Sequence, residues 1–307
     1  MAKSHLFLKF SAPYIQNLAW YEIKITLFSY HKYTIISAKT MFRVIFHTIG
    51  QNVFFRRIRP SNFASVKNTQ MMKNNVYKFS IQPEDVDQTR LSTIPSLYRK
   101  VISAVANNIR KEGYGVDVLS EKGQTWVLVR CGIEILRRPE LYADLTIAVW
   151  KGDEDSICHS RNVEIYGATG EMLGCGITDW SILDKESHRP VVMNLESTLE
   201  AKTVTCKKPR RIIQFEGGNT KHGQVGYSEC DFNGHLNNCR YVDWFFNLLP
   251  EKATALSSRI RLDINFKREI LKGADIIASI KEICSGQIDF CIRQSCGIAC
   301  LASLSVV

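Results

Sequence analysis

A short segment in the C-terminal third combines three side chains that could act together on an acyl group. Asp231, Asn233 and His235 are spaced two residues apart, and a predicted helix begins shortly after them. If the segment is extended, alternate side chains share one face and these three converge. The helix N-terminus would add N–H groups and a partial positive charge that suit an oxyanion. A carboxylate, a potential base and an oxyanion site are the parts that acyl transfer needs.

The same residue types also have an ordinary structural use. Asp, Asn and Gly are common in turns and before helices, and Gly234 permits a tight bend. Spacing alone therefore leaves a turn and helix cap open beside catalysis. Cys230 and Cys239 lie close to the segment, but a nucleophilic thiolate would require a lowered pKa, and we expect neither to act.

The elements that must position this segment occur twice along the chain. In the first set a strand at 77–81 is followed by a helix, which Thr93 is predicted to cap and Gly113 to end. Strands at 126–136, 145–150, 161–166 and 172–183 follow the helix. The second set comprises a strand at 224–228, a helix at 238–249, and strands at 260–266, 276–280, 288–292 and 297–304. The repeated order predicts an internal duplication.

Apolar periodicity indicates how these elements pack. The first helix carries an apolar stripe whose residues are spaced four positions apart, at Leu97, Val101, Val105 and Ile109. In the strand at 126–136, the alternation puts Val127, Val129, Cys131, Ile133 and Ile135 on one face, and Arg130 and Glu134 on the other. We therefore predict an α+β fold in which curved antiparallel sheets wrap around central helices.

Domain boundaries follow from the same pattern. We expect domains at 75–184 and 223–307, joined by a polar connector at 185–222, and a poorly ordered or non-native extension at 1–74. Three interpretations of the extension are open: a transit peptide, a membrane-surface arm, or non-native upstream sequence before a true start at Met71 or Met72. We favour the last, because the ordered pattern begins just after these methionines.

Charge and composition exclude several classes of function. Residues 1–70 hold ten Lys and Arg and only one acid, whereas the rest holds 30 basic and 29 acidic residues, a net of +1. The folded body is therefore not expected to bind nucleic acid. No apolar run approaches the ~20 residues of a transmembrane helix, so stable membrane insertion is not expected. Ten scattered cysteines, without a Cys-x-x-Cys pair, predict reduced thiols in a cytoplasmic protein and no metal site.

Several motifs resemble those of the acyl-acyl-carrier-protein (acyl-ACP) thioesterases. The run 231–238, Asp-Phe-Asn-Gly-His-Leu-Asn-Asn, followed by Tyr241 and Trp244, is similar to the family signature D-x-N-x-H-x-N-N-x-x-Y-x-x-W. The run 266–269, Phe-Lys-Arg-Glu, resembles the second motif. In the first half, the run 125–130, the Thr-Gly-Glu turn at 169–171 and Trp180 also fit. The resemblance covers about residues 75 to 305.

The resemblance implies two hot-dog domains, the first for acyl-chain binding and the second for catalysis. It implies Asp231 as the catalytic carboxylate, which attacks the thioester or acts through water. Asn233 and His235 would orient it and stabilise developing charge, and Glu269 would activate or place the hydrolytic water. Trp126 and Arg130 become candidate substrate contacts. No cofactor is implied. The partner would be acyl carrier protein, and the enzyme a monomer or homodimer in the cytoplasm, with a plastid as the alternative location.

One departure separates the sequence from many family members. They carry a cysteine directly after the glutamate, whereas this chain has Ile270, which cannot attack a thioester. We expect that cysteine to be dispensable; otherwise the protein is a catalytically silent acyl-binding module. The other alternative is a thioesterase acting on acyl-CoA, although no phosphate-binding Gly-rich loop is visible.

Overall fold

The computed structural model describes residues 3–10, 21–30, 33–35, 75–154, 156–195, 201–202, 204, 206–250 and 259–306. The chain forms two units, divided at residues 64 and 65. In the first, strands β1 (Lys3–Phe10), β2 (Tyr21–Tyr30) and β3 (Tyr33–Ile35) pair antiparallel. The rest of the predicted extension at 1–74 lies outside the described residues, so its nature stays a prediction.

The second unit is built on one antiparallel sheet of ten strands in the order β4-β6-β7-β8-β5-β10-β13-β12-β11-β9. Its N-terminal half, hereafter the N-half, contains β4 (Val76–Ser80), β5 (Gln124–Ile135), β6 (Asp144–Glu154), β7 (His159–Gly167) and β8 (Met172–Asp184). The C-terminal half, the C-half, contains β9 (Asn219–Gln224), β10 (Ile260–Phe266), β11 (Asp275–Cys284), β12 (Gln287–Gln294) and β13 (Gly297–Val306).

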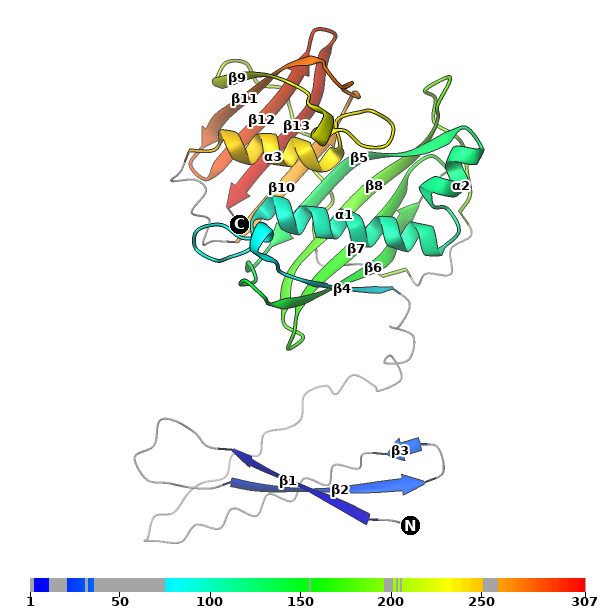
Figure 1. Cartoon of the computed structure of the whole chain (residues 1–307), viewed down its shortest axis with the longest axis vertical. Coiled ribbons are helices and arrows are strands. Elements are labelled where there is room, and N and C mark those ends of the chain that lie inside the picture. Colours follow the sequence, from blue (N-terminus) through cyan, green and yellow to red (C-terminus); the bar gives the residue numbers. More distant parts are fainter. Residues whose placement is uncertain are drawn as a thin grey trace. The chain divides into compact units, whose positions relative to one another are not determined.

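The two halves have the same topology. Numbered along the chain within each half, the strands follow the order 1-3-4-5-2, and the second strands of the two halves, β5 and β10, pair at the centre of the sheet. The predicted duplication is therefore real at the level of the fold. Figure 1 shows α1 (Ile94–Lys111) and α3 (Asn238–Leu248) on the same face of the sheet.

The first helix forms for the reasons its sequence suggests. Thr93 caps α1, because its side chain accepts a hydrogen bond from the Ser96 N–H. The predicted apolar stripe is buried against the sheet. The helices of the two halves are tied together by an ion pair of 2.7 Å between Arg99 and Asp243. Within the described residues, no helix is both long and apolar enough to span a membrane.

The central strand β5 differs from the predicted alternation. A bulge between Leu128 and Arg130 shifts the register, so Leu128 faces the core together with Cys131 and Ile133. Val127 and Val129 are only half-buried, and the prediction that they join the core face was wrong. A bulge adds one residue to a strand and exchanges the faces beyond it, which the period of two cannot anticipate.

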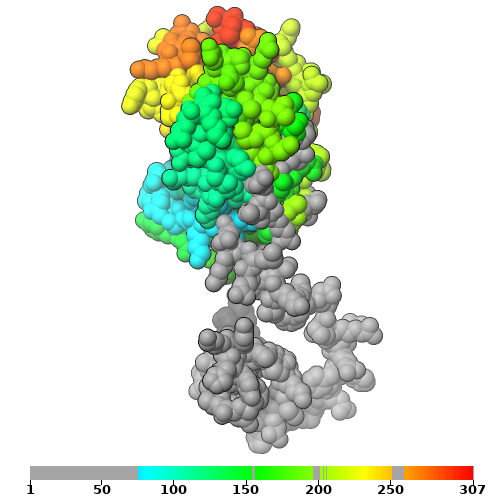
Figure 2. Space-filling view, turned by 90° about the vertical axis from the view of Figure 1, so that its right-hand side faces the viewer, coloured from blue at the N-terminus to red at the C-terminus, as the bar shows by residue number. Residues whose placement is uncertain are grey.

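Two further elements differ from the prediction. The first strand of the C-half is at 219–224 and not at 224–228. Its side chains are largely exposed at the edge of the sheet, so the apolar pattern gave no signal. The short helix α2 (Val116–Glu121) was not predicted. In Figure 2, the orange and red C-terminal strands form one end of this unit.

The connector between the halves packs on the sheet face opposite to the helices. Arg210 pairs with the buried Asp263 of β10 at 2.8 Å, and Arg261 donates to the carbonyl groups of Lys207 and Lys208. Arg261 also pairs with Glu134 of β5 at 2.6 Å. The connector thus covers polar groups of both halves, although it contributes no strand between residues 206 and 218.

Candidate active site

Residues 231–237, the C-half loop, connect the turn η4 (Tyr227–Glu229) to helix α3. The Gly234 N–H donates to the Asp231 carbonyl at 3.0 Å, and the Asp231 N–H donates to the His235 carbonyl at 2.8 Å. Gly234 adopts a φ of 78°, which favours glycine. The loop is therefore a tight turn at Gly234, the bend that the glycine permits, and not the extended alternative.

The carboxylate of Asp231 is fixed by the backbone of its own turn. Its Oδ1 accepts hydrogen bonds from the backbone N–H groups of Asn233, at 2.9 Å, and His235, at 3.3 Å. The side chains of Asp231, Asn233 and His235 are each half-buried. The turn consequently gives the carboxylate one orientation while leaving it open to a substrate.

His235 and Glu269 are brought together from separate parts of the chain. The His235 Nε2 lies 3.5 Å from the Glu269 Oε2, and Glu269 follows the end of β10. The Leu236 N–H donates to the Ile270 carbonyl at 2.7 Å, and the Lys272 N–H donates to the Gly234 carbonyl. These backbone bonds hold the segment that follows β10 against the loop and keep the Glu269 carboxylate within ion-pair distance of the imidazole.

Asn233 reaches across to the N-half. Its Nδ2 lies 3.4 Å from the Oγ1 of Thr125, a buried residue at the start of β5. Nearby, the Lys185 ammonium is 5.9 Å from the ring centroid of Phe232. Sequence reasoning did not assign Thr125 a role, because one sequence does not reveal that the start of β5 meets this loop. The site therefore contains residues of both halves.

The remaining signature residues support the loop. Asn237 caps α3, with its Oδ1 accepting from the Cys239 N–H at 2.9 Å, so one of the N–H groups expected to serve an oxyanion is occupied. Trp244 donates to Glu229 at 2.7 Å and fits against Gly223, where a Cβ would collide with its ring. Tyr241 is buried and packs edge-to-face on Phe266 at 5.4 Å.

Tyr241 is influenced by both carboxylates of the candidate site. Burial raises the pKa of Tyr241, and the neighbouring Cys300, Glu269 and Asp231 raise it further. Asp231 and Glu269 therefore both lie within electrostatic range of this buried phenol.

The candidate substrate contacts on β5 occupy different surroundings. Trp126 is half-buried beside Thr125, donates to the Tyr114 carbonyl at 2.8 Å and contacts the rings of His159 and Trp180. Arg130 is exposed, directly after the bulge and in register with Asn265 of β10. The structure thus brings Trp126 next to the site, whereas Arg130 lies further along the strand.

The cysteines near the loop are poorly suited to attack. Burial raises the pKa of the Cys239 thiol to about 12, so it is protonated at neutral pH. Ile270 is fully buried, and its side chain belongs to the hydrophobic core. A cysteine at that position would therefore point into the core. All ten cysteines are free.

One cluster outside the loop has donor atoms that a metal could use. Ligand atoms of Glu134, Cys175 and Cys206 lie within 4.8 Å of one another. However, an Arg261 nitrogen lies 2.6 Å from Glu134 and 4.0 Å from the Cys206 sulfur. A guanidinium already supplies the positive charge there, which opposes the binding of a cation.

The N-half contains a loop with the same backbone, at residues 87–93. The Asp87 N–H donates to the Leu91 carbonyl at 3.0 Å, and the Thr89 N–H donates to the Asp87 Oδ1 at 2.9 Å, as at Asp231. Leu91 replaces the histidine. Arg138 corresponds to Glu269, because the residues that follow them, Pro139 and Ile270, accept equivalent loop hydrogen bonds. The backbone was duplicated, but the chemical side chains were not.

Comparison with known sequences identifies the same two halves. Residues 73–200 match the acyl-ACP thioesterase N-terminal domain, and residues 214–300 match the C-terminal domain. The chain is 20 % identical over 225 residues to the chloroplastic oleoyl-acyl carrier protein thioesterase 2 of Arabidopsis thaliana, covering 66 % of this chain and 61 % of that protein. It is also 20 % identical to the chloroplastic dodecanoyl-acyl-carrier-protein hydrolase of Cinnamomum camphora, over 62 % of this chain and 55 % of the relative.

Solved structures agree in fold. An acyl-ACP thioesterase from Bacteroides thetaiotaomicron superposes with a TM-score of 0.70 at 20 % identity, covering 76 % of this chain and 97 % of that one. The 12:0-ACP thioesterase from Umbellularia californica gives 0.65 at 17 % identity, covering 75 % and 95 %. The architecture is therefore the double hot-dog predicted from the sequence. With both domain matches in order, the chain belongs to the acyl-ACP thioesterase family.

Proposed function

We propose that this protein hydrolyses fatty acyl thioesters of acyl carrier protein to free fatty acid and carrier thiol. The C-half loop carries the proposal: Asp231, Asn233 and His235 lie on one rigid turn, with Glu269 at 3.5 Å from the imidazole. The curated relatives are longer than the matched region, since the chain covers 61 % of the oleoyl thioesterase. Activity and substrate are therefore proposed for this chain on its own geometry.

Each side chain then has a distinct role. Asp231, oriented by two backbone N–H groups, attacks the thioester carbonyl or activates the attacking water. Asn233 and His235 stabilise the oxygen that becomes negative. Glu269 positions His235 and places the water. The carbon–sulfur bond breaks, water supplies the hydroxyl of the acid, and a proton passes to the departing thiolate.

Substrate binding would use both halves. Trp126 adjoins Thr125 at the site and is proposed to contact the acyl chain in the N-half. Lys267 and Arg268 are exposed next to Glu269 and could meet the acidic carrier protein. Arg137 and Arg138 cannot belong to the same patch. They follow the end of β5, whose Ile135 pairs with Ile260 at the start of β10, whereas Lys267 and Arg268 follow the end of β10, ~30 Å away. Arg130 stays a weaker candidate.

The test is free-fatty-acid release from the full chain, with acyl-carrier-protein and acyl-CoA thioesters of several chain lengths. Release from the carrier-protein substrates that collapses in Asp231→Ala supports the proposal. Release from acyl-CoA alone would favour the acyl-CoA thioesterase instead. A folded protein that releases nothing from either substrate would overturn the enzymatic function and leave a silent acyl-binding protein, as the residue at 270 allows.

We further propose that the protein works in the cytoplasm, as a monomer or homodimer. The alternative is a plastid, since the plant relatives are named as chloroplastic. Mass spectrometry of the mature N-terminus from native cells separates the two, since removal of most of residues 1–70 would indicate a transit peptide.

A further inference from the structure

A cavity of about 430 Å³ lies beside the N-half loop, where the duplicated backbone lacks the catalytic side chains. Its wall is mainly apolar and comes from the loop, the start of α1 and the centre of the sheet, with Leu91, Ile94, Ile135, Leu173 and Ile260 as members. A volume of this order suits a small amphiphile. Thr125 contacts the C-half loop, and Ile135, which lines the cavity, lies ten residues further along the same strand β5. The cavity is therefore ~30 Å from that loop.

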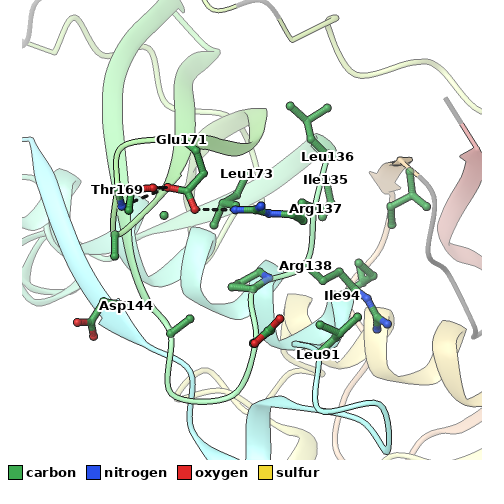
Figure 3. A pocket seen from close by; sticks show the side chains of 16 residues that line it. Leu91, Ile94, Ile135, Leu136, Arg137, Arg138, Asp144, Thr169, Glu171 and Leu173 are labelled. Atoms are coloured by element: carbon green, nitrogen blue, oxygen red, sulfur yellow. Dashed lines mark hydrogen bonds and ion pairs between the residues drawn. The ribbon is translucent and has the colours of Figure 1, made fainter. Parts of the chain in front are cut away.

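Arg138, which lines the cavity, carries a buried donor without an acceptor. The Arg138 side chain is 9 % exposed, and one end of its guanidinium pairs with Asp87 at 2.6 Å. Its Nε is buried and has no hydrogen-bond partner. Figure 3 shows Arg138 extending toward Leu91 and Ile94, whereas Arg137 points away to Glu171. A buried N–H without an acceptor is costly, so a ligand oxygen that reaches it after a small shift of the Arg138 side chain would be stabilised.

The charges around the cavity specify the kind of oxygen. Arg137 and Arg138 supply two positive charges. The carboxylates of Asp87, Glu140, Asp144 and Glu171 supply four negative charges, so negative charge exceeds positive charge by two around the cavity. The Thr-Gly-Glu turn holds Glu171 at the rim, where it pairs with Arg137 at 2.6 Å. The surroundings therefore repel a carboxylate but accept an uncharged carbonyl.

We propose that this cavity is a second, non-hydrolytic acyl site, which binds an apolar acyl chain whose uncharged carbonyl oxygen accepts from the Arg138 Nε. A thioester supplies such a carbonyl, and so does a protonated fatty acid. Hydrolysis does not follow there, because Leu91 and Arg138 stand where the C-half has His235 and Glu269. The site does not depend on whether the C-half loop is active.

The test uses the full chain and dodecanoyl-pantetheine in which an amide replaces the thioester, titrated by calorimetry at pH 8. Wild type should bind two equivalents, one at the candidate active site and one in this cavity. Ala143→Trp, which fills the cavity from its lining, should bind one. Its thermal unfolding midpoint must match that of wild type. Equal stoichiometry in the two proteins would overturn the proposal, whether or not the chain hydrolyses thioesters.

Two further binding measurements test which oxygen-containing group the second site accepts. Arg138→Lys keeps a positive charge for Asp87 but removes the Nε donor, and should weaken the second site about tenfold. Dodecanoate at pH 8 should bind the second site far more weakly than the amide does. Equal affinity of Arg138→Lys and wild type, or of the carboxylate and the amide, would overturn the assignment of an uncharged carbonyl.

Discussion

The loops at 231–237 and 87–93 are two copies of one backbone with different side chains. In both, an aspartate accepts from the backbone N–H two residues later, at 2.9 Å in each loop, and a capping residue begins the following helix. The residue with positive φ is Gly234 in one and Arg90, at 63°, in the other. The turn is thus a folding unit that does not require catalytic residues.

The difference lies in what surrounds each aspartate. Asp87 is paired with Arg138, whereas the position equivalent to Arg138 holds Glu269, which faces His235. Burial would raise the pKa of Asp87, but hydrogen bonds from Thr89 and Arg138 outweigh it and hold the pKa below its ordinary value. An aspartate neutralised by arginine is a structural ion pair, while one beside an imidazole and a second carboxylate is available for chemistry.

The largest expected effect comes from the matched pair Asp231→Asn and Asp87→Asn. Asp231→Asn keeps the backbone turn but removes the carboxylate charge, and should lower kcat by about 10²–10⁴-fold. Asp87→Asn should leave kcat near the wild-type value, because its loop is remote from the site. Steady-state kinetics with an acyl-carrier-protein thioester measures both, and an equal loss in the two variants would contradict the asymmetry.

Glu269→Arg transfers the ion pair of the N-half loop to the C-half loop. The new guanidinium should pair with Asp231 and withdraw its carboxylate from the reaction, lowering kcat about 10²-fold. Glu269→Gln is the control, since it removes the carboxylate without adding a cation, and should lose less. If the two substitutions reduce kcat equally, the charge of Asp231 is not what distinguishes the loops.

The pH dependence of stability should differ between wild type and Asp87→Asn. Because the folded pKa of Asp87 lies below its ordinary value of 3.8, the carboxylate stabilises the protein above that value. This contribution is lost as the pH falls through the folded pKa. Thermal midpoints should show Asp87→Asn less stable near pH 6, and the gap should narrow as the pH falls below 3.8. A constant gap would indicate that the ion pair does not carry the effect.

The smallest effect is expected from Ile270→Cys, which restores the residue common in the family. The side chain at 270 is fully buried, and only its carbonyl reaches the loop. Stability should fall by ~1 kcal/mol from lost packing, and kcat should stay near wild type. Urea unfolding and steady-state assays measure the two. A large gain in kcat would mean that a cysteine here enters the chemistry.

Much of the fold was predictable because local rules determine it. Thr93 and the stripe at Leu97, Val101 and Val105 predicted α1, and the duplicated pattern predicted two similar halves. The β5 bulge and the exposed strand β9 were not predictable, since neither leaves an apolar alternation. The sequence left open whether 231–235 is extended or turns at Gly234; the hydrogen bonds of Asp231 and Gly234 make it a tight turn.

The sequence by itself determined which residues are capable of chemistry: Asp231, Asn233 and His235 on one loop, and Glu269 in a second motif. Only the tertiary structure decided that Glu269 meets His235, that Thr125 of the other half meets Asn233, and that Arg138 takes the equivalent place in the N-half. Sequence fixes residue types and local spacing, whereas these pairs depend on strands β5 and β10 lying side by side at the centre of the sheet.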